Sequence, residues 1–308
     1  TVTDADQSII SDTAEITVNP GVHANAGVDQ VLQKGSSFEL GGTPTCIGGV
    51  DPEYEWLPTD ELNDNVIANP TTSPSKDYEY QVIIVDKNDC TDTDEISIVV
   101  LPFTLGVSQD FALLSADSII VSSATYENGS VGANTYVDAN ITASGDISVN
   151  DGDEPQAITD FNKTLSDIDA LTAEELPNLF EDTTINAGIY HISGSLTIRG
   201  HLSLTGNLNS YFVFIVSDTL MIENGTSIQL QGMKPSQVFF RTMGNIFGED
   251  TISLAGVFLA SGNIILNDVS GAVQLLANGE IKFNKISNGG NYNYLLYTPP
   301  VPKSPILR

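Results

Sequence analysis

The sequence predicts an all-β fold with one long helix, in which a right-handed β-solenoid with a flanking α-helix follows a β-sandwich. Three observations predict this fold. Short apolar strands recur at a nearly fixed step in the last two thirds of the chain, as they do in stacked coils. One segment in the middle has apolar residues at helical spacing. The first third has short alternating strands separated by turn residues.

The solenoid prediction depends on a repeated three-residue sequence motif, which we call a phrase. Gly244–Ile246, with the sequence Gly-Asn-Ile, recurs as Gly262–Ile264 and, with Glu in place of Asn, as Gly279–Ile281. The steps are 18 and 17 residues, and each phrase opens a short apolar strand. Strands at a fixed step, punctuated by Gly and Asn, are typical of coils stacked on one another. We expect such a coil to have flat outer faces, which suit the binding of other surfaces.

A helix is predicted over about residues 156–171. Five apolar residues there fall at steps of three or four: Ile158, Phe161, Leu165, Ile168 and Leu171. They form one stripe, and the opposite side is polar, so we expect the helix to lie against the coil. Either Asp153 or Thr159 is placed to cap its start. Thr172–Glu175 has the form of a capping box for a second short helical turn before Pro177.

The first third of the chain is predicted to be a β-sandwich. Its expected strands are Phe38–Leu40, Tyr54–Trp56, Tyr78–Val85 and Glu95–Val100, with Gly-rich and Asp-Pro turns between them. Pro102 has no N–H to give to a ladder, so the sheet should end near it. We therefore place a hinge there, a sandwich domain over 21–102, a solenoid domain over 103–300 and a tail over 301–308.

The first twenty residues repeat a later segment. Shifted by 80 residues, Thr1–Asn19 aligns without a gap on Gln81–Val99, so that Asp6 meets Asp86 and Ile10 meets Cys90. A step of about 80 residues is the size of one sandwich module. Residues 1–20 are thus predicted to be the last hairpin of an upstream module. An isolated hairpin is only marginally stable, so it should pair with its own missing domain, the neighbouring module or another chain.

Two cysteines, Cys46 and Cys90, lie in this first third. An even pair in a β-rich, secreted chain most simply forms one disulfide, and two cysteines alone are too few for a structural zinc site. The order Cys46, Trp56, Cys90 resembles that of an immunoglobulin-like core, in which an indole packs on a bridge between two sheets. The sandwich is therefore predicted to be immunoglobulin-like.

Composition excludes some partners. The chain has 40 acidic and 11 basic residues and a formal net charge of −29. Nucleic acid and anionic membrane both require clustered Lys and Arg, so neither is an expected partner. No stretch reaches the roughly 18 apolar residues of a membrane span, so no transmembrane segment is predicted. Few aromatic residues with abundant Thr, Ser, Asn, Asp and Gly favour a secreted protein, either processed or a piece of a longer chain.

Two acidic loops are candidate calcium sites. Oxygen ligands are concentrated at Asp86, Asn88, Asp89, Asp92 and Asp94 in one hairpin and at Asp151 and Asp153 in another loop. Calcium takes six to eight oxygens, and neither run has EF-hand spacing. The alternative is that these are solvated turn residues. No other cofactor is predicted.

Nothing in the sequence favours an enzyme. There is no Gly-x-Ser-x-Gly elbow and no Gly-rich phosphate loop. Acidic pairs such as Glu249-Asp250 fall at turns, where acids are expected in any case. His191 and His201 are isolated from each other and from both cysteines, and we expect them on the surface or at an edge. The chain is predicted to be non-catalytic.

The last two thirds resemble the ice-binding protein family of microbes, which has a discontinuous β-solenoid. The resemblance covers about residues 105–297 and depends on an ordered set of phrases: Phe111–Ala116 followed by Ile119-Ile120, the central helix, Asn186–Tyr190, Leu202–Gly206, Phe212–Ile215, Val238–Phe240, Gly256–Leu259 and Gly271–Ala277. Asn186-Ala187 stands where the family usually has a small residue and Pro. The resemblance implies a non-catalytic domain that binds ice through a flat face bearing small residues.

The first hundred residues resemble the PKD-like (polycystic-kidney-disease-like), immunoglobulin-fold repeats of large bacterial surface proteins. Tyr78, Tyr80 and Val82, with the segment Val85–Cys90, carry this resemblance. It implies a stalk of repeats within one polypeptide that holds a terminal domain away from the cell.

The predicted binding face consists of small hydroxyl residues of the coil. The candidates are Ser193, Thr197, Ser203, Thr205, Thr226, Thr251 and Ser253. Bulky outward residues such as Arg199, Gln229 and Lys282 interrupt them and weigh against ice as the ligand. A shift of one residue in a strand would exchange the inward and outward sets.

The predicted function follows from these expectations. The chain is expected to be a bacterial cell-surface adhesin, whose solenoid is carried on an immunoglobulin-like stalk and binds ice, another solid, a glycan or a cell through a flat face. The alternative is a structural subunit of an extracellular filament, assembled from neighbouring copies by strand or face pairing, because unpaired strand edges template association.

Overall fold

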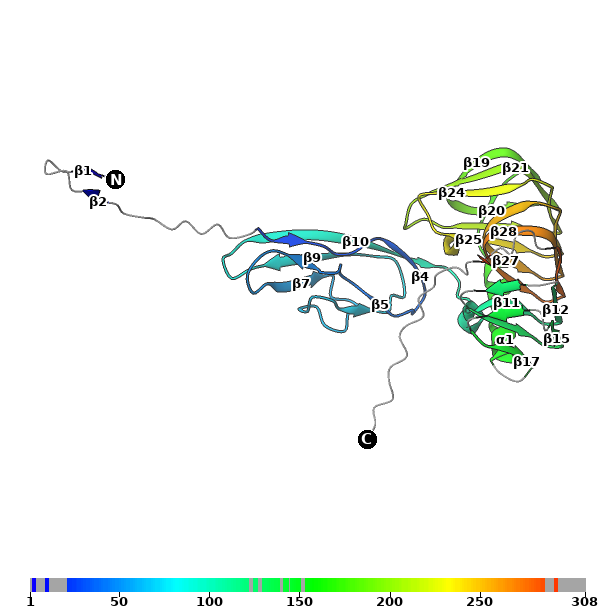
Figure 1. The fold of residues 1–308 in the computed structure, drawn as a ribbon, viewed down its shortest axis with the longest axis horizontal. Helices are drawn as coiled ribbons and strands as arrows, with labels where there is room; N and C mark the ends of the chain where they lie inside the picture. The colour runs from blue at the N-terminus through cyan, green and yellow to red at the C-terminus, as the bar shows by residue number, and fades with distance from the viewer. Residues whose placement is uncertain are drawn as a thin grey trace, which may run out of the picture. The chain divides into compact units, whose positions relative to one another are not determined.

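The computed structural model of the 308-residue chain describes residues 2–3, 9–10, 21–121, 124–126, 129–138, 141–143, 145–150, 153–285 and 291–292 (Figure 1). It has two compact units. Unit 1 comprises Thr1–Gly27, Glu39–Thr72 and Tyr80–Ile96, and unit 2 comprises Val28–Phe38, Ser73–Glu79 and Ser97–Arg308. The division into domains at residue 102 stays a prediction.

The strands predicted in the first third are present. The main sheet has the order β4 (Gln30–Gln33), β10 (Thr91–Leu101), β9 (Tyr78–Val85), β7 (Glu53–Leu57). Strand β7 runs antiparallel to β9, whereas β4 runs parallel to β10. Two further pairs are β3 (His23–Ala24) with β6 (Cys46–Ile47) and β5 (Phe38–Glu39) with β8 (Thr71–Thr72). Strand β10 ends at Leu101, directly before Pro102, as predicted.

The core of unit 1 is built around two aromatic side chains. Trp56 and Tyr80 are fully buried. The indole N–H of Trp56 donates to the carbonyl of Ile67 at 3.1 Å, and the Tyr80 hydroxyl donates to the carbonyl of Asp60 at 3.0 Å. Each ring therefore packs in the core while its polar atom keeps a hydrogen bond, which avoids the cost of an unpaired buried group.

The predicted disulfide is wrong in this structure, because Cys46 and Cys90 are free thiols. The Cys46 thiol donates to the carbonyl of Gly48 at 3.5 Å. Cys90 follows a tight turn in which its backbone N–H donates to Asp86 at 3.0 Å. Trp56 is therefore buried without a bridge beneath it, since backbone and carboxylate hydrogen bonds hold these loops instead.

The predicted N-terminal hairpin is described at two short strands. Strands β1 (Val2–Thr3) and β2 (Ile9–Ile10) pair antiparallel, with Val2 opposite Ile10. The rest of residues 1–20 lies outside the described part of the chain.

Unit 2 contains a β-solenoid, as the sequence predicts. The solenoid has three faces, and each face is a sheet of parallel strands. Face A stacks β18 (Glu174–Glu175), β20 (Gly188–Ile192), β22 (Phe212–Val216), β25 (Val238–Thr242), the end of β27 (Ile252–Ala260), the end of β28 (Ile264–Ala277), β11 (Phe111–Ser115), β14 (Ser130–Ala133) and β17 (Ile147–Val149). Face B stacks the start of β19 (Leu179–Asn186), the start of β21 (Leu196–Thr205), β23 (Leu220–Ile222), β26 (Ile246–Gly248), the start of β28, β29 (Ile281–Lys285), β12 (Ser118–Val121) and β15 (Tyr136–Val137).

Face C completes each coil. It stacks the ends of β19 and β21, then β24 (Ser227–Gln231), the start of β27 and the middle of β28. A separate parallel sheet has the order β16 (Ile141–Ala143), β13 (Ala124–Tyr126), β30 (Asn291–Tyr292). On faces A and B the N-terminal strands β11 and β12 pair with β28 and β29 from the C-terminal part, so the order of coils in space differs from their order in the chain.

The Gly-Asn-Ile segments are layered on one another. Ile246 pairs with Ile264, which pairs with Ile281, and all three are buried. The same in-register stacking aligns aromatic rings in the core. Phe214 and Phe240 stack with centroids 4.8 Å apart, and Phe240 and Phe258 at 4.9 Å. The repeat therefore works as predicted, because parallel in-register coils place like residues directly above like residues.

One helix lies along face A. Helix α1 spans Glu154–Asp169, close to the predicted 156–171, and Asp153 is its N-cap residue. Phe161, Leu165 and Ile168 of the predicted stripe are buried in one cluster with outward residues of face A. The predicted second helical turn is wrong, because Glu174–Glu175 form β18 and pair with β20. Two short 3-10 helices, η1 (Gly106–Asp110) and η2 (Pro235–Gln237), precede β11 and β25. None of the helices described is long and apolar enough to cross a membrane.

Candidate surface-binding site

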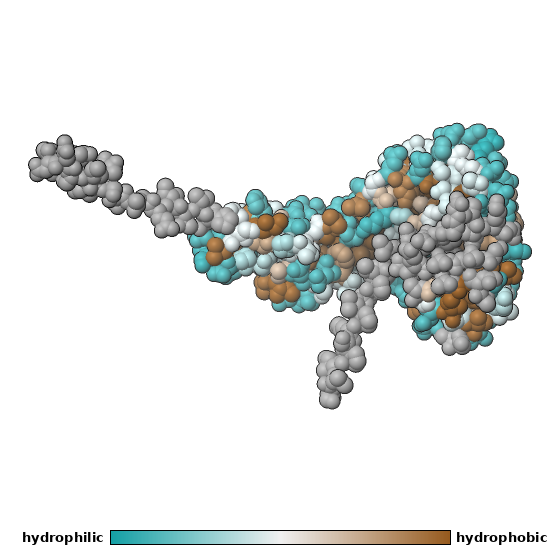
Figure 2. Space-filling view, viewed as in Figure 1, coloured by the Kyte–Doolittle hydropathy of each residue, from teal (hydrophilic) through white to brown (hydrophobic). Residues whose placement is uncertain are grey.

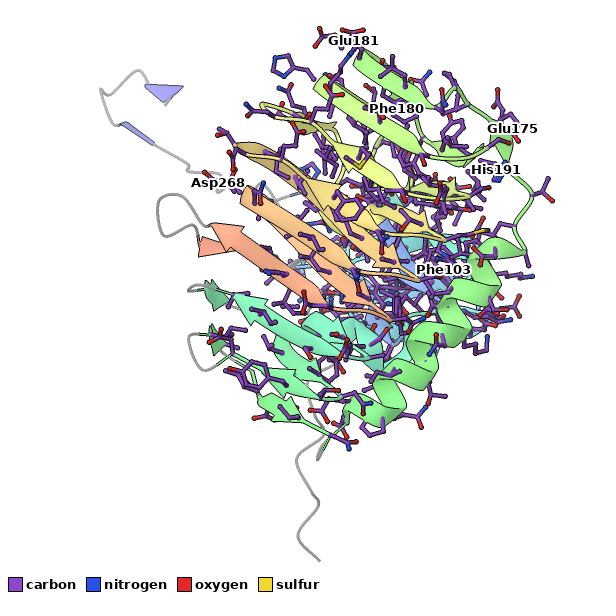
Figure 3. All side chains as sticks on the ribbon, turned by 90° about the vertical axis from the view of Figure 1, so that its right-hand side faces the viewer. Phe103, Glu175, Phe180, Glu181, His191 and Asp268 are labelled. Carbon is purple, nitrogen blue, oxygen red and sulfur yellow. The ribbon has the colours of Figure 1, made fainter. Side chains whose placement is uncertain are left out.

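Face A is not available to a ligand along the length of helix α1. Its outward residues Val213, Ile215 and Phe239 are buried in the same cluster as the helix stripe. Arg241 also points outward here and is only 4% exposed. Figure 3 shows the helix running along the ends of the stacked strands. Faces B and C remain as the surfaces of the coil that a large flat ligand could contact.

Face B carries one in-register column of outward side chains. All of them except Leu179, which begins its strand, lie between two buried neighbours, so alternation points them to solvent. From one end of the stack to the other the column is Leu179, Thr197, Met221, Phe247, Ile265, Lys282 and Ile120. Leu179 is 40% exposed and the others are half-buried. The centre of face B is therefore an apolar strip three coils long, Met221 to Ile265, with one hydroxyl and one ammonium on the column.

The edge of face B is set by the Gly-Asn turns. The backbone N–H of Asn263 donates to the side-chain Oδ1 of Asn245 at 2.8 Å, and the N–H of Glu280 donates to Oδ1 of Asn263 at 2.8 Å. A Cβ at Gly262 would lie 2.3 Å from Asn245 Oδ1, and a Cβ at Gly279 would lie 2.0 Å from Asn263 Oδ1. Glycine is therefore needed before each bonded residue, and this explains why Gly and Asn recur together.

Face C is polar. One outward column runs through His201, Ser227, Ser253 and Ser270. His201 Nδ1 and the Ser227 hydroxyl are 2.9 Å apart. Exposed Gln229 lies beside this column, pairs with Ser203, and donates to Ser227 at 3.2 Å. Hydrogen-bonded hydroxyls and long amides thus dominate face C, in contrast to the apolar centre of face B.

The seven predicted binding residues do not share a face. Ser203, Thr205 and Ser253 lie on face C, and Thr197 lies on face B. Ser193 is exposed near the end of β20 and donates to Glu175 at 3.3 Å. Thr251 is exposed at the turn before β27, with φ of 59°.

Thr226 is wrong as a surface residue. It is 1% exposed, and its hydroxyl donates to the carbonyl of Ile198 in the adjacent coil at 3.1 Å. It directly follows Gly225, whose φ of 76° turns the chain back toward the core.

The predicted binding face, which was chosen by residue type, did not include the apolar strip. Met221, Phe247 and Ile265 are large and were not among the candidates. A signal for two of them was present in the repeat, because Phe247 and Ile265, like Lys282, directly follow the Ile of each phrase. Since that Ile points inward, its successor must point outward.

The acidic hairpin of unit 1 uses its carboxylates to hold backbone. Asp86 accepts from the N–H groups of Asn88, Cys90 and Val50 at 2.8, 3.0 and 3.2 Å. Asp92 and Asp94 accept from Ala24 and Ala26, each at 2.8 Å. Burial raises the pKa of Asp86, but the backbone N–H donors outweigh it and leave its pKa below the usual range.

A calcium site is not assembled from the described residues. Within the described ranges no group of three His, Cys, Asp or Glu side chains is placed to hold a metal ion. Asp153 caps the start of α1 in sequence but makes no side-chain capping bond, and Asp151 lies outside the described residues. Asn88 donates to Asp86, and Asp89 adopts a φ of 59° in the same turn. Calcium binding stays a prediction.

A histidine at the top of face A has two polar partners. His191 Nδ1 lies 2.6 Å from Glu175 Oε1 (Figure 3). His191 Nε2 lies 2.7 Å from the Ser217 hydroxyl. The hydrogen bond from His191 is the main reason that the pKa of Glu175 is lowered. The backbone N–H of Ser217 donates to the carbonyl of Ile192 in the adjacent coil. This N–H group therefore holds two coils together and is not free to stabilise an oxyanion. We assign this cluster to the structure of the coil.

Comparison with known proteins agrees with the architecture. A family model described as Ice-binding-like matches residues 106–287. The crystal structure of an ice-binding protein from the Antarctic ascomycete Antarctomyces psychrotrophicus is similar, with a TM-score of 0.56 and 23% identity, covering 63% of this chain and 97% of that one. No curated protein sequence matches the chain significantly.

Two more solved structures extend the likeness to other organisms. An ice-binding protein from an Antarctic Flavobacteriaceae bacterium has a TM-score of 0.56 and 25% identity, and the match covers 60% of this chain and 47% of that one. The protein LeIBP from an Arctic yeast has a TM-score of 0.52 and 18% identity, covering 67% of this chain and 98% of that one. Because the family model matches more than half of the sequence, the chain belongs to the ice-binding-like family.

Proposed function

We propose that the chain is a non-enzymatic protein that binds ice through face B of its solenoid. The observation that carries this proposal is the in-register outward column of that face, in which Met221, Phe247 and Ile265 succeed one another on adjacent coils. Family membership supports ice as the ligand, and the two solved structures from the Antarctic ascomycete and the Arctic yeast, which are similar in fold, are of ice-binding proteins.

The physical basis is a flat, regular and weakly hydrated surface. Parallel strands lie about 4.8 Å apart, so a column of like side chains repeats at that interval. Apolar groups cannot hydrogen-bond to water, and water next to them must keep its bonds to other water molecules. A rigid apolar strip edged by polar groups therefore favours an ordered layer of water. Lys282 and the Arg199–Glu181 ion pair, with N–O distance 2.7 Å, limit the strip to the middle coils.

Face C is the weaker candidate. Its exposed amides, such as Gln229, are flexible and hydrogen-bond to bulk water. Its hydroxyls are partly occupied by one another, as in the contact of His201 with Ser227. Side chains that already form hydrogen bonds with liquid water gain less free energy from contact with an ice surface.

The test is a charge placed at the centre of each face. Phe247→Lys introduces a hydrated ammonium in the middle of face B, whereas Gln229→Lys introduces the same group on face C. We expect Phe247→Lys to lose most of the thermal hysteresis and ice-affinity partitioning, and Gln229→Lys to keep both. Circular dichroism verifies that both variants are folded. Loss with Gln229→Lys but not Phe247→Lys would move the site to face C, and a wild-type chain without ice affinity would reject the proposal.

The wider role is also a proposal. An extracellular adhesin, in which an immunoglobulin-like or PKD-like stalk within the same polypeptide carries the solenoid, agrees with the net charge of −29 and with the paired strands β4, β10, β9 and β7. The alternative is a filament subunit, for which the antiparallel pair β1–β2 is the relevant feature, because a two-stranded unit is marginal until it pairs further. In the filament alternative, neighbouring copies replace ice as the partner.

A further inference from the structure

The Gly-Asn turns at the edge of face B hold two amides in a fixed orientation. Asn245 Oδ1 accepts the backbone N–H of Asn263, and Asn263 Oδ1 accepts the N–H of Glu280, each at 2.8 Å. A backbone N–H can only donate, so the atom facing it must be the amide oxygen. This bond removes the usual ambiguity between the oxygen and nitrogen of an asparagine. The Nδ2 groups are therefore on the side of each amide away from the bonded backbone.

Both Nδ2 groups remain as donors without a hydrogen-bond acceptor among the residues that the structure describes. Asn245 and Asn263 are half-exposed, and they occupy the same position on two adjacent coils, since each directly precedes a stacked Ile. The two donors thus repeat at the coil spacing of about 4.8 Å. The next two coils differ, because the residues before their inward Leu are Thr219 and Ser195, whose hydroxyls donate to Asp218 at 3.3 and 2.8 Å and are already used.

We propose that the Nδ2 groups of Asn245 and Asn263 are part of the ice-binding surface and donate hydrogen bonds to the ordered water at the edge of face B. This inference depends on the proposed function, because it assigns two further contact residues to the same face. They border the apolar strip, because Phe247 and Ile265 are each two residues further along the chain in β26 and β28.

The reason these amides suit the role is that their freedom has already been lost on folding. An exposed Gln or Asn must be immobilised when it binds, which costs side-chain conformational entropy. Asn245 and Asn263 are immobilised by the coil itself, and the glycines before Asn263 and Glu280 leave room for the amide oxygens. Their donors are therefore presented to water at fixed positions before any ice is contacted.

The experiment separates the acceptor from the donor of each amide. Asn245→Asp with Asn263→Asp keeps an oxygen to accept the backbone N–H but replaces each outward NH2 with a second oxygen, which cannot donate. The matched control is Gln229→Glu with Gln231→Glu, which makes the same change of charge on face C. Thermal hysteresis, ice-affinity partitioning and the melting temperature are measured for the whole chain and for both double variants.

We expect the Asn double variant to lose thermal hysteresis several-fold with a melting temperature close to that of the wild type, and the Gln double variant to retain it. Equal hysteresis in the Asn variant and the wild type, with the wild type active, would overturn the inference and leave the proposed function standing. An equal loss in both double variants would also overturn it, because charge alone would then explain the effect. Absence of ice affinity in the wild type would reject the proposed function and this inference together.

If the Asn double variant melts well below the wild type, the two single variants are measured in its place. A loss of hysteresis in a single variant that retains the wild-type melting temperature supports the inference. Hysteresis that falls only in proportion to the melting temperature would assign the two asparagines to stability alone.

Discussion

Single glycines fix how closely the coils approach. Gly271, in the middle of β28, has φ of 113°, and a Cβ there would lie 2.0 Å from the carbonyl oxygen of Leu254 in the adjacent coil. Both the backbone conformation and the space exclude other residues. Gly271 begins the last segment of the resemblance to the ice-binding family, Gly271–Ala277, but the clash comes from a strand seventeen residues earlier in the chain. The sequence shows that a glycine stands here, but the reason that only glycine fits is visible only in the structure.

Gly271→Ala is expected to destabilise unit 2 by about 1–3 kcal/mol, because the new methyl must displace backbone and the φ value is strained. The measurement is the free energy of unfolding in urea. Gly21→Ala is the control, since the atom nearest to a Cβ added at that position is 4.0 Å away. Equal stability of the two variants would show that the coils can separate at Gly271 without cost.

At the scale of elements, the contact between α1 and face A combines an apolar stripe with one ion pair. Arg241 Nε and Nη2 donate to the two carboxylate oxygens of Asp169 at 2.9 and 2.8 Å, and Nη1 donates to the Ser261 hydroxyl at 2.8 Å. The Arg241 side chain is 5% exposed and that of Asp169 is 29% exposed. The pair therefore joins the C-terminal end of the helix to β25 in a partly dehydrated environment, where a bidentate contact is strong.

Arg241→Met is expected to lower the free energy of unfolding by about 2–4 kcal/mol, because it leaves a partly buried carboxylate unpaired. Lys163→Met is the matched control. It removes the exposed Lys163–Asp167 pair, which is one helical turn apart on α1, and should cost at most about 0.5 kcal/mol. Urea denaturation followed by circular dichroism measures both. A similar loss in the two variants would argue against a special role for Arg241.

The helix itself was predictable from sequence, whereas the segment after it was not. Five apolar residues at helical steps identify α1, because burial of one stripe is a local consequence of residue order. The capping-box pattern at Thr172–Glu175 predicted a further helical turn, but Glu174 and Glu175 pair with Tyr190 and His191 in β18. Backbone pairing with a coil sixteen residues later outweighs a local capping preference.

At the scale of the whole molecule, the face drawn in Figure 2 has hydrophobic residues in separate patches between hydrophilic ones. The net charge of −29 makes acid stability informative. In unit 1 the pKa of Asp86 is lowered, since its backbone donors outweigh the effect of burial. The pKa of Asp92 is lowered mainly by the N–H of Ala24. A carboxylate with a depressed folded-state pKa stabilises the fold above its ordinary pKa and loses that contribution as the pH falls.

Unit 1 is therefore expected to lose stability as the pH is lowered from 7 to below about 4, the ordinary range of Asp. The chain has one tryptophan, Trp56, and it is fully buried in unit 1, so its fluorescence in urea reports this unit. We expect Asp86→Asn to be less stable than the wild type at pH 7 and to show a smaller loss on acidification. Glu53→Gln, at an exposed site on β7, is the control and should follow the wild type. An unchanged pH dependence in Asp86→Asn would contradict the assignment.

The sequence by itself determined the coil, its helix and the strands of the first third, because all of these follow from the local spacing of apolar, turn and glycine residues. It also indicated that Phe247, Ile265 and Lys282 face outward, because each follows the inward Ile of a repeat. Tertiary structure alone decided which of those outward residues share a surface. Thr197 and Ser203 are six residues apart in one strand, yet they lie on different faces because β21 bends at Gly200, where φ is 71°. Burial of Thr226, the free thiols of Cys46 and Cys90, and the alignment of Met221 with Phe247 and Ile265 likewise depend on contacts between coils and loops that are distant in sequence.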